Sequence, residues 1–355
     1  MKFRFTWRAM TAVLLLCMAG LAGTAWADGP IAKLPWLHEG LQLTYTWGAS
    51  AGAGFGGVGY GQTTIACIDG DKVVVSSQPF AQAGPLGNNA PVPLMGANTT
   101  MVTAANAGDF WIDPGQLAAM HGDPDQGVTV SSETAKMAGQ PVKAVRIQVR
   151  GAASYTDHLY DLKTGLCLHF DTSGQGGQTE GDFVAMRDLA IPWSQEPSPD
   201  WVAAVKALHY RGDIEFRGGA LPQVPNVLAI DMTTASRGPG WIQLDSVLNS
   251  QMQGAPAALP SKSQIFYGRS QFAGLWAGPK ALAQLKTGQV LDQDPVTQMK
   301  TFVAKVDNDS VTITSANAAG EIDSQFDKHS GILIGSGFYS VMSRQYWTVR
   351  LQSRE

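Results

Sequence analysis

A serine stands at the centre of a glycine-x-serine-x-glycine pattern in residues 48–52, the spacing that presents the nucleophile in many hydrolases. That chemistry needs a helix directly after Ser50, because main-chain N–H groups at its start would stabilise an oxyanion. Residues 53–59 are instead rich in glycine, which disfavours a helix. A glycine-x-glycine-x-x-glycine match in residues 52–57 needs the same helix to hold a pyrophosphate. The sequence therefore favours a loop here and predicts no catalytic residue.

Two histidines, His158 and His169, lie among the acidic residues Asp157, Asp161 and Asp171. They flank an expected hairpin turn, so an acid–base site is geometrically feasible there. None of the histidine spacings in the chain matches a zinc-binding pattern. Ordinary strand and turn positions explain the group better. The sequence therefore predicts no metal and no cofactor, and His158 and His169 remain candidates for facing a ligand.

Aromatic residues are the other candidates for ligand contact. Trp47, Phe55 and Tyr60 lie in or beside the glycine-rich tract 48–61, which is either a flexible hairpin tip or a mobile flap over a cavity. The remaining tryptophans could form a platform for a sugar or a lipid. Because several recur at equivalent places in two halves of the chain, anchoring of the core is favoured.

Two segments of the chain resemble each other, which indicates an internal duplication. Residues 110–118 and 275–283 keep a tryptophan, a proline, a leucine and an alanine at the same spacing. Both copies close on the pattern aspartate-x-x-threonine/serine-glycine followed by an apolar strand, in residues 160–166 and 326–332. We expect each Trp-x-x-Pro segment to bury its indole and to begin a short helix at the proline.

A second resemblance joins residues 62–75 to residues 300–313, each read as strand, tight turn and strand. The Asp-Gly and Asn-Asp pairs at their turns are expected to adopt positive φ. This match precedes the Trp-x-x-Pro segment in one half and follows it in the other. It therefore reflects either an imperfect duplication or generic hairpins.

The predicted fold class is mainly β, with two related curved antiparallel sheets or incomplete barrels, each with a short packed helix. The expected helices are residues 113–121 with Asp113 as N-cap, residues 279–286, and residues 200–208 capped by Asp200. Alternating or β-branched segments predict the strands. These segments are residues 41–47, 73–77, 142–150, 166–170, 227–232, 241–248, 263–267 and 345–351.

The N-terminus is typical of a secretory signal peptide. A basic start, an apolar stretch and the small-x-small site at residues 25–27 predict cleavage before Asp28. Three prolines within residues 192–200 mark a boundary between halves. The expected organisation is therefore a signal peptide in 1–27, a first β-rich half in 28–196 and a second in 197–355. Export places the protein in the periplasm, with no transmembrane segment after cleavage.

The chain is acidic, with a net charge of −4 before signal cleavage, and it lacks basic runs. This argues against nucleic acid as a partner. Two cysteines remain after cleavage, Cys67 and Cys167, and an oxidising compartment would allow a disulfide between them. Two buried thiols are the equal alternative.

No catalytic constellation survives its structural requirements. The leading hypothesis is a non-catalytic binding or carrier protein for an apolar or amphipathic ligand, or an envelope assembly factor with an envelope protein as partner. The first alternative is a hydrolase whose carboxylates and histidines are scattered along the chain. The second is a scaffold that binds a protein partner through a sheet edge.

Overall fold

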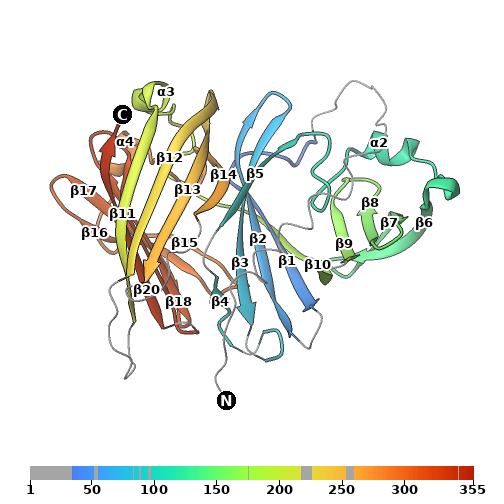
Figure 1. The fold of residues 1–355 in the computed structure, drawn as a ribbon. Coiled ribbons are helices and arrows are strands. Elements are labelled where there is room, and N and C mark those ends of the chain that lie inside the picture. The colour runs from blue at the N-terminus through green and yellow to red at the C-terminus, as the bar shows by residue number, and fades with distance from the viewer. Residues whose placement is uncertain are drawn as a thin grey trace, which may run out of the picture. The chain divides into compact units, whose positions relative to one another are not determined.

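The computed structural model describes residues 34–51, 55–82, 84–87, 89–94, 97–174, 176–216, 226–252, 260–342 and 344–355. The predicted signal peptide lies outside the described residues. The described chain is mainly β and forms two antiparallel sheets of ten strands each, with few short helices (Figure 1). The predicted fold class is confirmed.

The first sheet has the strand order β4-β3-β2-β1-β10-β9-β8-β7-β6, with β5 paired to β3. Its strands are β1 (Leu41–Ala51), β2 (Phe55–Asp69), β3 (Lys72–Gln82), β4 (Val92–Pro93), β5 (Asn98–Thr103), β6 (Val128–Met137), β7 (Gln140–Arg150), β8 (Tyr155–Asp161), β9 (Cys167–Gly174) and β10 (Gly177–Asp188).

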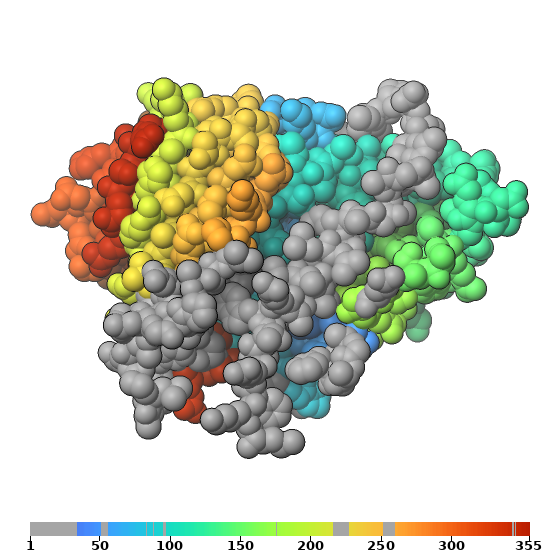
Figure 2. Space-filling view, viewed as in Figure 1, coloured from blue at the N-terminus to red at the C-terminus, as the bar shows by residue number. Residues whose placement is uncertain are grey.

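The second sheet has the order β14-β13-β12-β11-β20-β19-β18-β17-β16-β15. Its strands are β11 (Ala207–Phe216), β12 (Asn226–Gly238), β13 (Trp241–Met252), β14 (Ser261–Gly268), β15 (Val290–Gln293), β16 (Lys300–Val306), β17 (Ser310–Asn317), β18 (Gly320–Asp327), β19 (Leu333–Ser340) and β20 (Gln345–Arg354). The paired strands β12 and β13 form one continuous surface, yellow in Figure 2.

The two orders correspond strand by strand, except at one end. In each sheet the first strand of the copy lies between the second strand and the last strand, as β1 does between β2 and β10 and β11 between β12 and β20. From there β9 to β6 correspond to β19 to β16, and β15 then adds one more strand in the second sheet. Below, the first sheet with its helix is called the first copy and the second sheet with its helices the second copy.

The chain divides into two compact units. The first unit comprises described residues of 34–37, 43–61 and 102–186, and so contains β6 to β9. The second comprises described residues of 38–42, 62–101 and 187–355, and so contains the whole second sheet.

Helices α2 and α4 each begin at the proline that the sequence indicates, and an aspartate caps α2. Helix α2 (Pro114–Ala119) begins at its proline, and Asp113 Oδ1 accepts the N–H groups of Gly115 and Gln116 at 2.9 and 3.1 Å. Helix α4 (Pro279–Leu282) also begins at its proline. Both helices are shorter than predicted. A 3-10 turn, η1 (Pro124–Gln126), precedes β6.

The predicted cap of the third helix is wrong. Helix α3 (Asp200–Ala204) has Pro199 as its N-cap, so Asp200 is the first helical residue and makes no side-chain cap. Helix α4 has Gly278 where α2 has Asp113. Glu196 supplies the missing carboxylate and accepts the N–H groups of Lys280 and Ala281 at 3.2 and 2.6 Å.

A pair of tryptophans anchors each copy in the same way. In the first copy the indole N–H of Trp36 donates to Thr164 O at 2.8 Å, and the ring meets Trp111 edge to face at 6.0 Å. In the second, Trp201 donates to Ser330 O at 2.8 Å and its ring lies 6.4 Å from that of its partner, Trp276. The two central indoles are buried, so the prediction of core anchoring is confirmed for these pairs.

A glycine closes each of these anchors. Gly165 and Gly331 have φ of +76° and +71°. A Cβ at Gly165 would lie 1.9 Å from Ile112 O, and one at Gly331 would lie 2.1 Å from Ala277 O. Only glycine fits this close main-chain approach, which explains why the closing sequence pattern recurs.

The turns correct two sequence expectations. Gly70 adopts positive φ between β2 and β3, but neither Asn308 nor Asp309 does so between β16 and β17. These two hairpins occupy different places in their sheets, so their likeness is generic. The glycine-rich tract is mostly strand, because β1 runs to Ala51 and β2 begins at Phe55.

The last strand of the chain completes the second sheet. β20 pairs with β11 along its length. The final residue, Glu355, exchanges main-chain hydrogen bonds with Ala207, at 3.0 Å from its N–H and 3.4 Å to its carbonyl. Among the described residues, no helix is long and apolar enough to cross a membrane.

Candidate partner-binding edge in the first copy

Strand β6 ends the first sheet, and its main-chain groups alternate between two directions. Thr129, Ser131 and Glu133 face β7, while Val128 exchanges hydrogen bonds with Asp123 on the opposite side, at 2.8 and 2.9 Å. Because successive residues of a strand point their N–H and C=O groups in opposite directions, every second residue after Val128 directs these groups away from β7. We call this side of β6 its outer edge.

The outer edge is covered only at its beginning. Gly122 lies beside Val130, since a Cβ at Gly122 would be 3.4 Å from Val130 N. Beyond it, the main-chain groups of Ser132, Thr134 and Lys136 face outward, and no strand among the described residues lies on that side of them. Residues 132–136, called the open edge here, therefore present unpaired main-chain donors and acceptors, which are a template for another strand.

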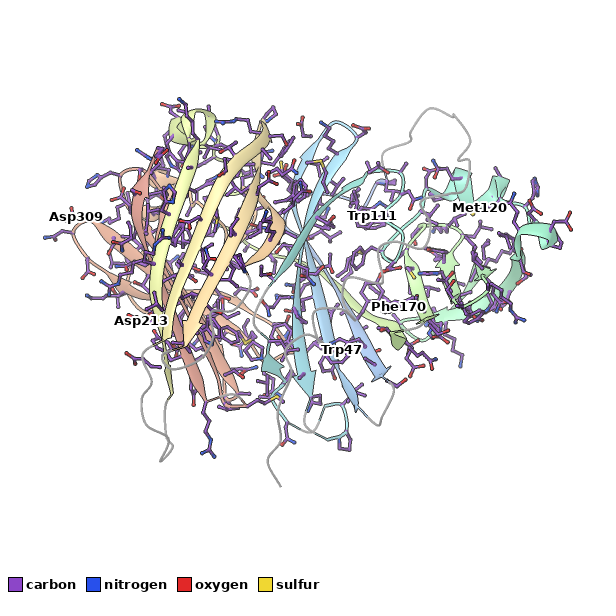
Figure 3. The ribbon with its side chains drawn as sticks, viewed as in Figure 1. Trp47, Trp111, Met120, Phe170, Asp213 and Asp309 are labelled. Atoms are coloured by element: carbon purple, nitrogen blue, oxygen red, sulfur yellow. The ribbon has the colours of Figure 1, made fainter. Side chains whose placement is uncertain are left out.

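A groove of about 330 Å³ lies next to this edge, between α2 and the sheet. It is called the α2 groove. Val145 and Leu117 are buried at its base and Met120 is half-buried, while His121, Ser131 and Ser132 add polar groups to its lining. Figure 3 labels Met120 beside α2. The lining residues are Leu117, Ala118, Met120, His121, Gly122, Val130, Ser131, Ser132, Val145 and Leu162.

The registers of the sheets match β6 to β16 residue by residue. Val130 of β6 pairs with Ile147 of β7, and Val303 of β16 pairs with Ile313 of β17. The two isoleucines lie at equivalent places. Two residues before each of them is a valine, Val145 or Val311, and this valine pairs with the buried aromatic residue of the next strand, β8 or β18. Val130 and Val303 are therefore equivalent.

The equivalent edge in the second copy is covered. The N–H of Val303 donates to Gln289 O, and its C=O accepts from Gly288 N–H, both at 2.8 Å. β15 then continues along β16, and Val306 N–H donates to Thr287 Oγ1 at 3.1 Å. The cover comes from the connector between helix and edge strand, residues 283–299, which is about twice as long as the first copy's connector, residues 120–127.

An aspartate gives the next equivalence between the connectors. Asp123 bridges Val128 at the start of β6, and Asp292 pairs with Thr301 of β16. Val128 and Thr301 each lie two positions before the equivalent valines, so the two aspartates correspond. Before the aspartates the connectors diverge, because a β-bulge inserts Leu291 between Asp292 and Val290, which pairs with Phe302.

The residue before the aspartate is Gly122 in the first copy, whereas in the second it is the bulge residue Leu291, which has no counterpart in the first. Leu291 packs against a core cluster that includes Leu282 of α4 and Val311 of β17. In the first copy the corresponding leucine and valine line the α2 groove, where Gly122 contributes no side chain. The groove is thus the place that the second copy fills with its own leucine.

Two lysines lie at the far end of the open edge. Lys136 of β6 and Lys143 of β7 are exposed, and Lys143 pairs with Thr134 in the register. Neither ammonium group has an ion-pair partner among the described residues. Both lie on the face of the sheet that carries Val130, since their register positions alternate in step with it.

The opposite face of β6 is closed by an ion-pair network. Arg146 binds Glu133 through Nε and Nη2 at 3.1 and 2.9 Å, and both Asp157 oxygens through Nη1 at 2.8 Å. The hydrogen bond from Arg146 lowers the pKa of the Glu133 carboxyl. Burial raises the pKa of Asp157, but hydrogen bonds from Gln148, Arg146 and Tyr155 outweigh burial and bring it below its ordinary value. This network therefore fixes β6 against β7.

The two candidate histidines are each paired locally. His158 is buried, with Nε2 2.8 Å from Asp109 Oδ1 and its ring stacked on Tyr160 at 5.9 Å. His169 is half-buried, with Nδ1 2.8 Å from Asp182 Oδ1. They lie on opposite faces of the sheet, because their register positions differ by one residue. The structure does not bring them together.

The aromatic candidates lie away from the open edge. The indole N–H of Trp47 in β1 donates to Tyr60 O of β2 at 3.1 Å. Tyr60 is buried. Phe55 is the first residue of β2, and its side chain lies outside the described part. In Figure 3, Trp47 is well separated from Met120 of the α2 groove.

The cysteines and Ser50 carry no evident chemistry. Cys67 and Cys167 are both free and buried, so the disulfide alternative is not what the structure shows. Burial raises the pKa of the Cys67 thiol to about 12 and that of Cys167 well above its ordinary value. Ser50 is exposed within strand β1. No group of three or more potential metal ligands occurs among the described residues.

Sequence reasoning missed β6, the strand that carries this site. Its apolar residues change face along the strand, with Val128 and Val130 on one face, Ala135 and Met137 on the other and polar residues 131–134 between them, so a single alternation is missing. Its hairpin turn is formed by Ala138 and Gly139, with φ of +49° and +80°. The signal that could have revealed the strand is Val128-x-Val130 before this turn, but alanine is an unusual residue at positive φ.

No family model matches this chain, and no curated protein matches it. Among solved structures it is similar to MucB in complex with MucA(peri), at 11% identity over 88% of this chain and 87% of that chain, with a TM-score of 0.23. The MucA/MucB complex of Pseudomonas aeruginosa matches at 10% identity, 88% of each chain and 0.22.

A protein of unknown function from the DUF3598 family of Nostoc punctiforme matches at 8% identity, 88% of this chain, 96% of that chain and a TM-score of 0.15. Similarity at this level is weak. What this chain does therefore has to be inferred from its own residues.

Proposed function

We propose that the protein is an exported, non-catalytic binding protein that receives an extended segment of a protein partner along the open edge of β6. The observation that carries this proposal is the difference between the copies. Residues 287–293 accompany the outer side of β16 to its last residue, Val306, whereas no strand among the described residues lies on the outer side of β6 at Ser132, Thr134 and Lys136. Strand addition to an exposed edge is a common mode of peptide recognition.

The rest of the first copy supports rigid presentation of this edge. Arg146 ties Glu133 of β6 to Asp157 of β8, two strands away. The core beneath α2 packs Leu117 against Val145 and its neighbours. A pre-organised strand gives up less conformational freedom on binding, which favours affinity.

A small apolar ligand in the α2 groove alone would explain less. A cavity of about 330 Å³ is near the lower end of typical small-molecule sites. Such a ligand would leave the outward main-chain groups of Ser132 and Thr134 without a role. A polypeptide uses both the edge and the groove. The predicted signal peptide at residues 1–27 supports a periplasmic setting, where the partner would be an envelope protein.

Site-specific photo-crosslinking tests this function in the producing cells. A photoreactive amino acid at Thr134 should trap a defined partner, because Thr134 lies in the middle of the open edge. The same group at Lys305, exposed on the covered strand β16, is the matched control and should trap much less. Ser132→Pro should abolish trapping at Thr134 without unfolding the chain, since proline removes only an outward N–H of an edge strand.

Two further variants sharpen the result. Ser132→Ala should keep the trapping, because only the side chain changes. A chimera that carries residues 283–299 in place of residues 120–127 should lose it, because the grafted connector would cover its own edge. Equal trapping at Thr134 and Lys305, or trapping that survives Ser132→Pro, would contradict the proposal.

A further inference from the structure

We infer that the partner segment runs antiparallel to β6, seats one apolar side chain in the α2 groove opposite Ser132, and carries an acidic residue two or four positions before it. This inference rests on the proposed function and adds the chemistry and direction of the bound segment. Three observations carry it: the leucine of the second copy, the register of β6, and the pair of free lysines.

The second copy shows what fills such a groove. Leu291 lies at a β-bulge in the short strand β15, which runs antiparallel to β16, and it packs against the core cluster that includes Leu282 and Val311. The first copy has Gly122 before its corresponding aspartate and no counterpart of this bulge leucine, so the α2 groove stays open between Leu117 and Val145. An apolar side chain on an added strand would restore the packing that the second copy makes within itself.

The register fixes which residue of the segment enters the groove. Ser132 and Val130 line the groove and share one face of the sheet. In an antiparallel pair, residues directly opposite each other project to the same face. The residue opposite Ser132 therefore projects into the groove, and its main-chain groups meet the outward groups of Ser132. Gly122 prevents pairing further towards Val130, so the groove marks the C-terminal end of the added strand.

The lysines then set the charge of the segment. In an antiparallel strand, the residues two and four positions before the apolar residue lie opposite Thr134 and Lys136, on the same face. Lys136 and Lys143 are exposed there and free of ion-pair partners among the described residues. Acidic side chains at these two positions would lie within reach of both ammonium groups. The preferred order is thus acidic, any, acidic, any, apolar.

A matched pair of labelled peptides tests the inference with the full-length protein. The probe is Gly-Glu-Thr-Glu-Thr-Leu-Thr-Gly, and the control has the same composition in reverse order. Fluorescence anisotropy should show binding of the probe and at least tenfold weaker binding of the control. Leucine-to-alanine in the probe should weaken binding about ten- to a hundredfold, because a buried leucine is lost.

Charge reversal supplies the second readout. Lys136→Glu with Lys143→Glu should weaken probe binding about two- to fivefold, as expected for exposed ion pairs. A probe with lysine in place of both glutamates should bind this variant better than the parent. Neither lysine contributes to the core, so the variant is expected to fold.

The outcomes separate this inference from the proposed function. Equal binding of the probe and the reversed control, or of the probe and its leucine-to-alanine variant, overturns the inference. So does absence of probe binding while the photoreactive group at Thr134 still traps a partner, and in that case the proposed function stands. If the probe does not bind and the photoreactive group at Thr134 traps no partner, the inference and the proposed function are both contradicted. If sedimentation shows a dimer that Ser132→Pro converts to monomer, the occupant is a second copy of the chain, and the inference is again wrong.

Discussion

Strand β16 has β15 and residues 287–289 along its outer side, whereas in the described part of the chain the equivalent strand β6 has only Gly122 and Asp123 beside its beginning. The two strands otherwise occupy the same place in sheets of matching order. The difference lies in one connector, which is long in the second copy and short in the first. In the second copy the long connector covers the edge strand. In the first copy the short connector leaves the main-chain groups of β6 and the α2 groove exposed.

The largest expected effect concerns the features that both copies share. Trp111→Ala and Trp276→Ala should each lower the free energy of unfolding by about 3–5 kcal/mol, because each removes a buried indole. Urea unfolding followed by the remaining tryptophan fluorescence measures both losses. A loss below about 1 kcal/mol in one copy and not in the other would show that the two anchors are not equivalent.

The next effect is specific to the second copy. Leu291→Ala should cost about 1–2 kcal/mol, because the half-buried leucine leaves a cavity against α4 and β17. The variant would create in the second copy the groove that the first copy already has. Hydrogen exchange of Val303 should then become faster. Unchanged stability and exchange would mean that Leu291 does not fill an equivalent place.

The helix caps should show a smaller effect. Asp113→Ala and Glu196→Ala should each cost about 1 kcal/mol, since each carboxylate accepts N–H groups at a helix start. Circular dichroism during urea unfolding measures the two losses. Asp113 lies at most three residues from the N–H groups that donate to it, whereas Glu196 reaches α4 from the segment between the copies. A neutral Glu196→Ala would show that α4 does not need the distant cap.

The smallest effect is a pH dependence of the network that fixes β6. Asp157 has a pKa below its ordinary value of 3.8 in the folded protein. Its contribution to stability is therefore fully present above the unfolded value and is lost as pH falls through the folded value. Asp157→Asn should flatten the acid limb of the stability curve, as measured by unfolding at a series of pH values. An unchanged acid limb would show that Arg146 and Gln148 do not favour the charged form.

Much of the fold follows from local signals in the sequence. Proline at the start of a helix, an aspartate before it and glycine at a positive φ each act within a few residues, and so α2, α4 and the closing glycines could be predicted. The tryptophan anchors could be predicted because the duplication repeats them. The alternating and β-branched segments likewise predict the mainly β class.

The candidate site could not be predicted, because it depends on what lies beside a strand. The apolar residues of β6 change face halfway along the strand and so give no continuous periodic signal, and only the register with β7 shows that the main-chain groups of Ser132 face outward. Likewise, four residues from 290 to 293 gave no sign that they cover β16. Long-range pairing decides both, and side-chain patterns read along the chain do not contain it.

The pairing of Glu355 with Ala207 constrains the order in which the second sheet can form. β11 is made well before its neighbour β20, so the second sheet cannot complete its strand order until β20 has been synthesised. Pairing between strands far apart in the sequence slows folding and leaves a strand edge exposed until both strands are present. A chain that lacks β20 would leave one edge of β11 open to pairing with other strands.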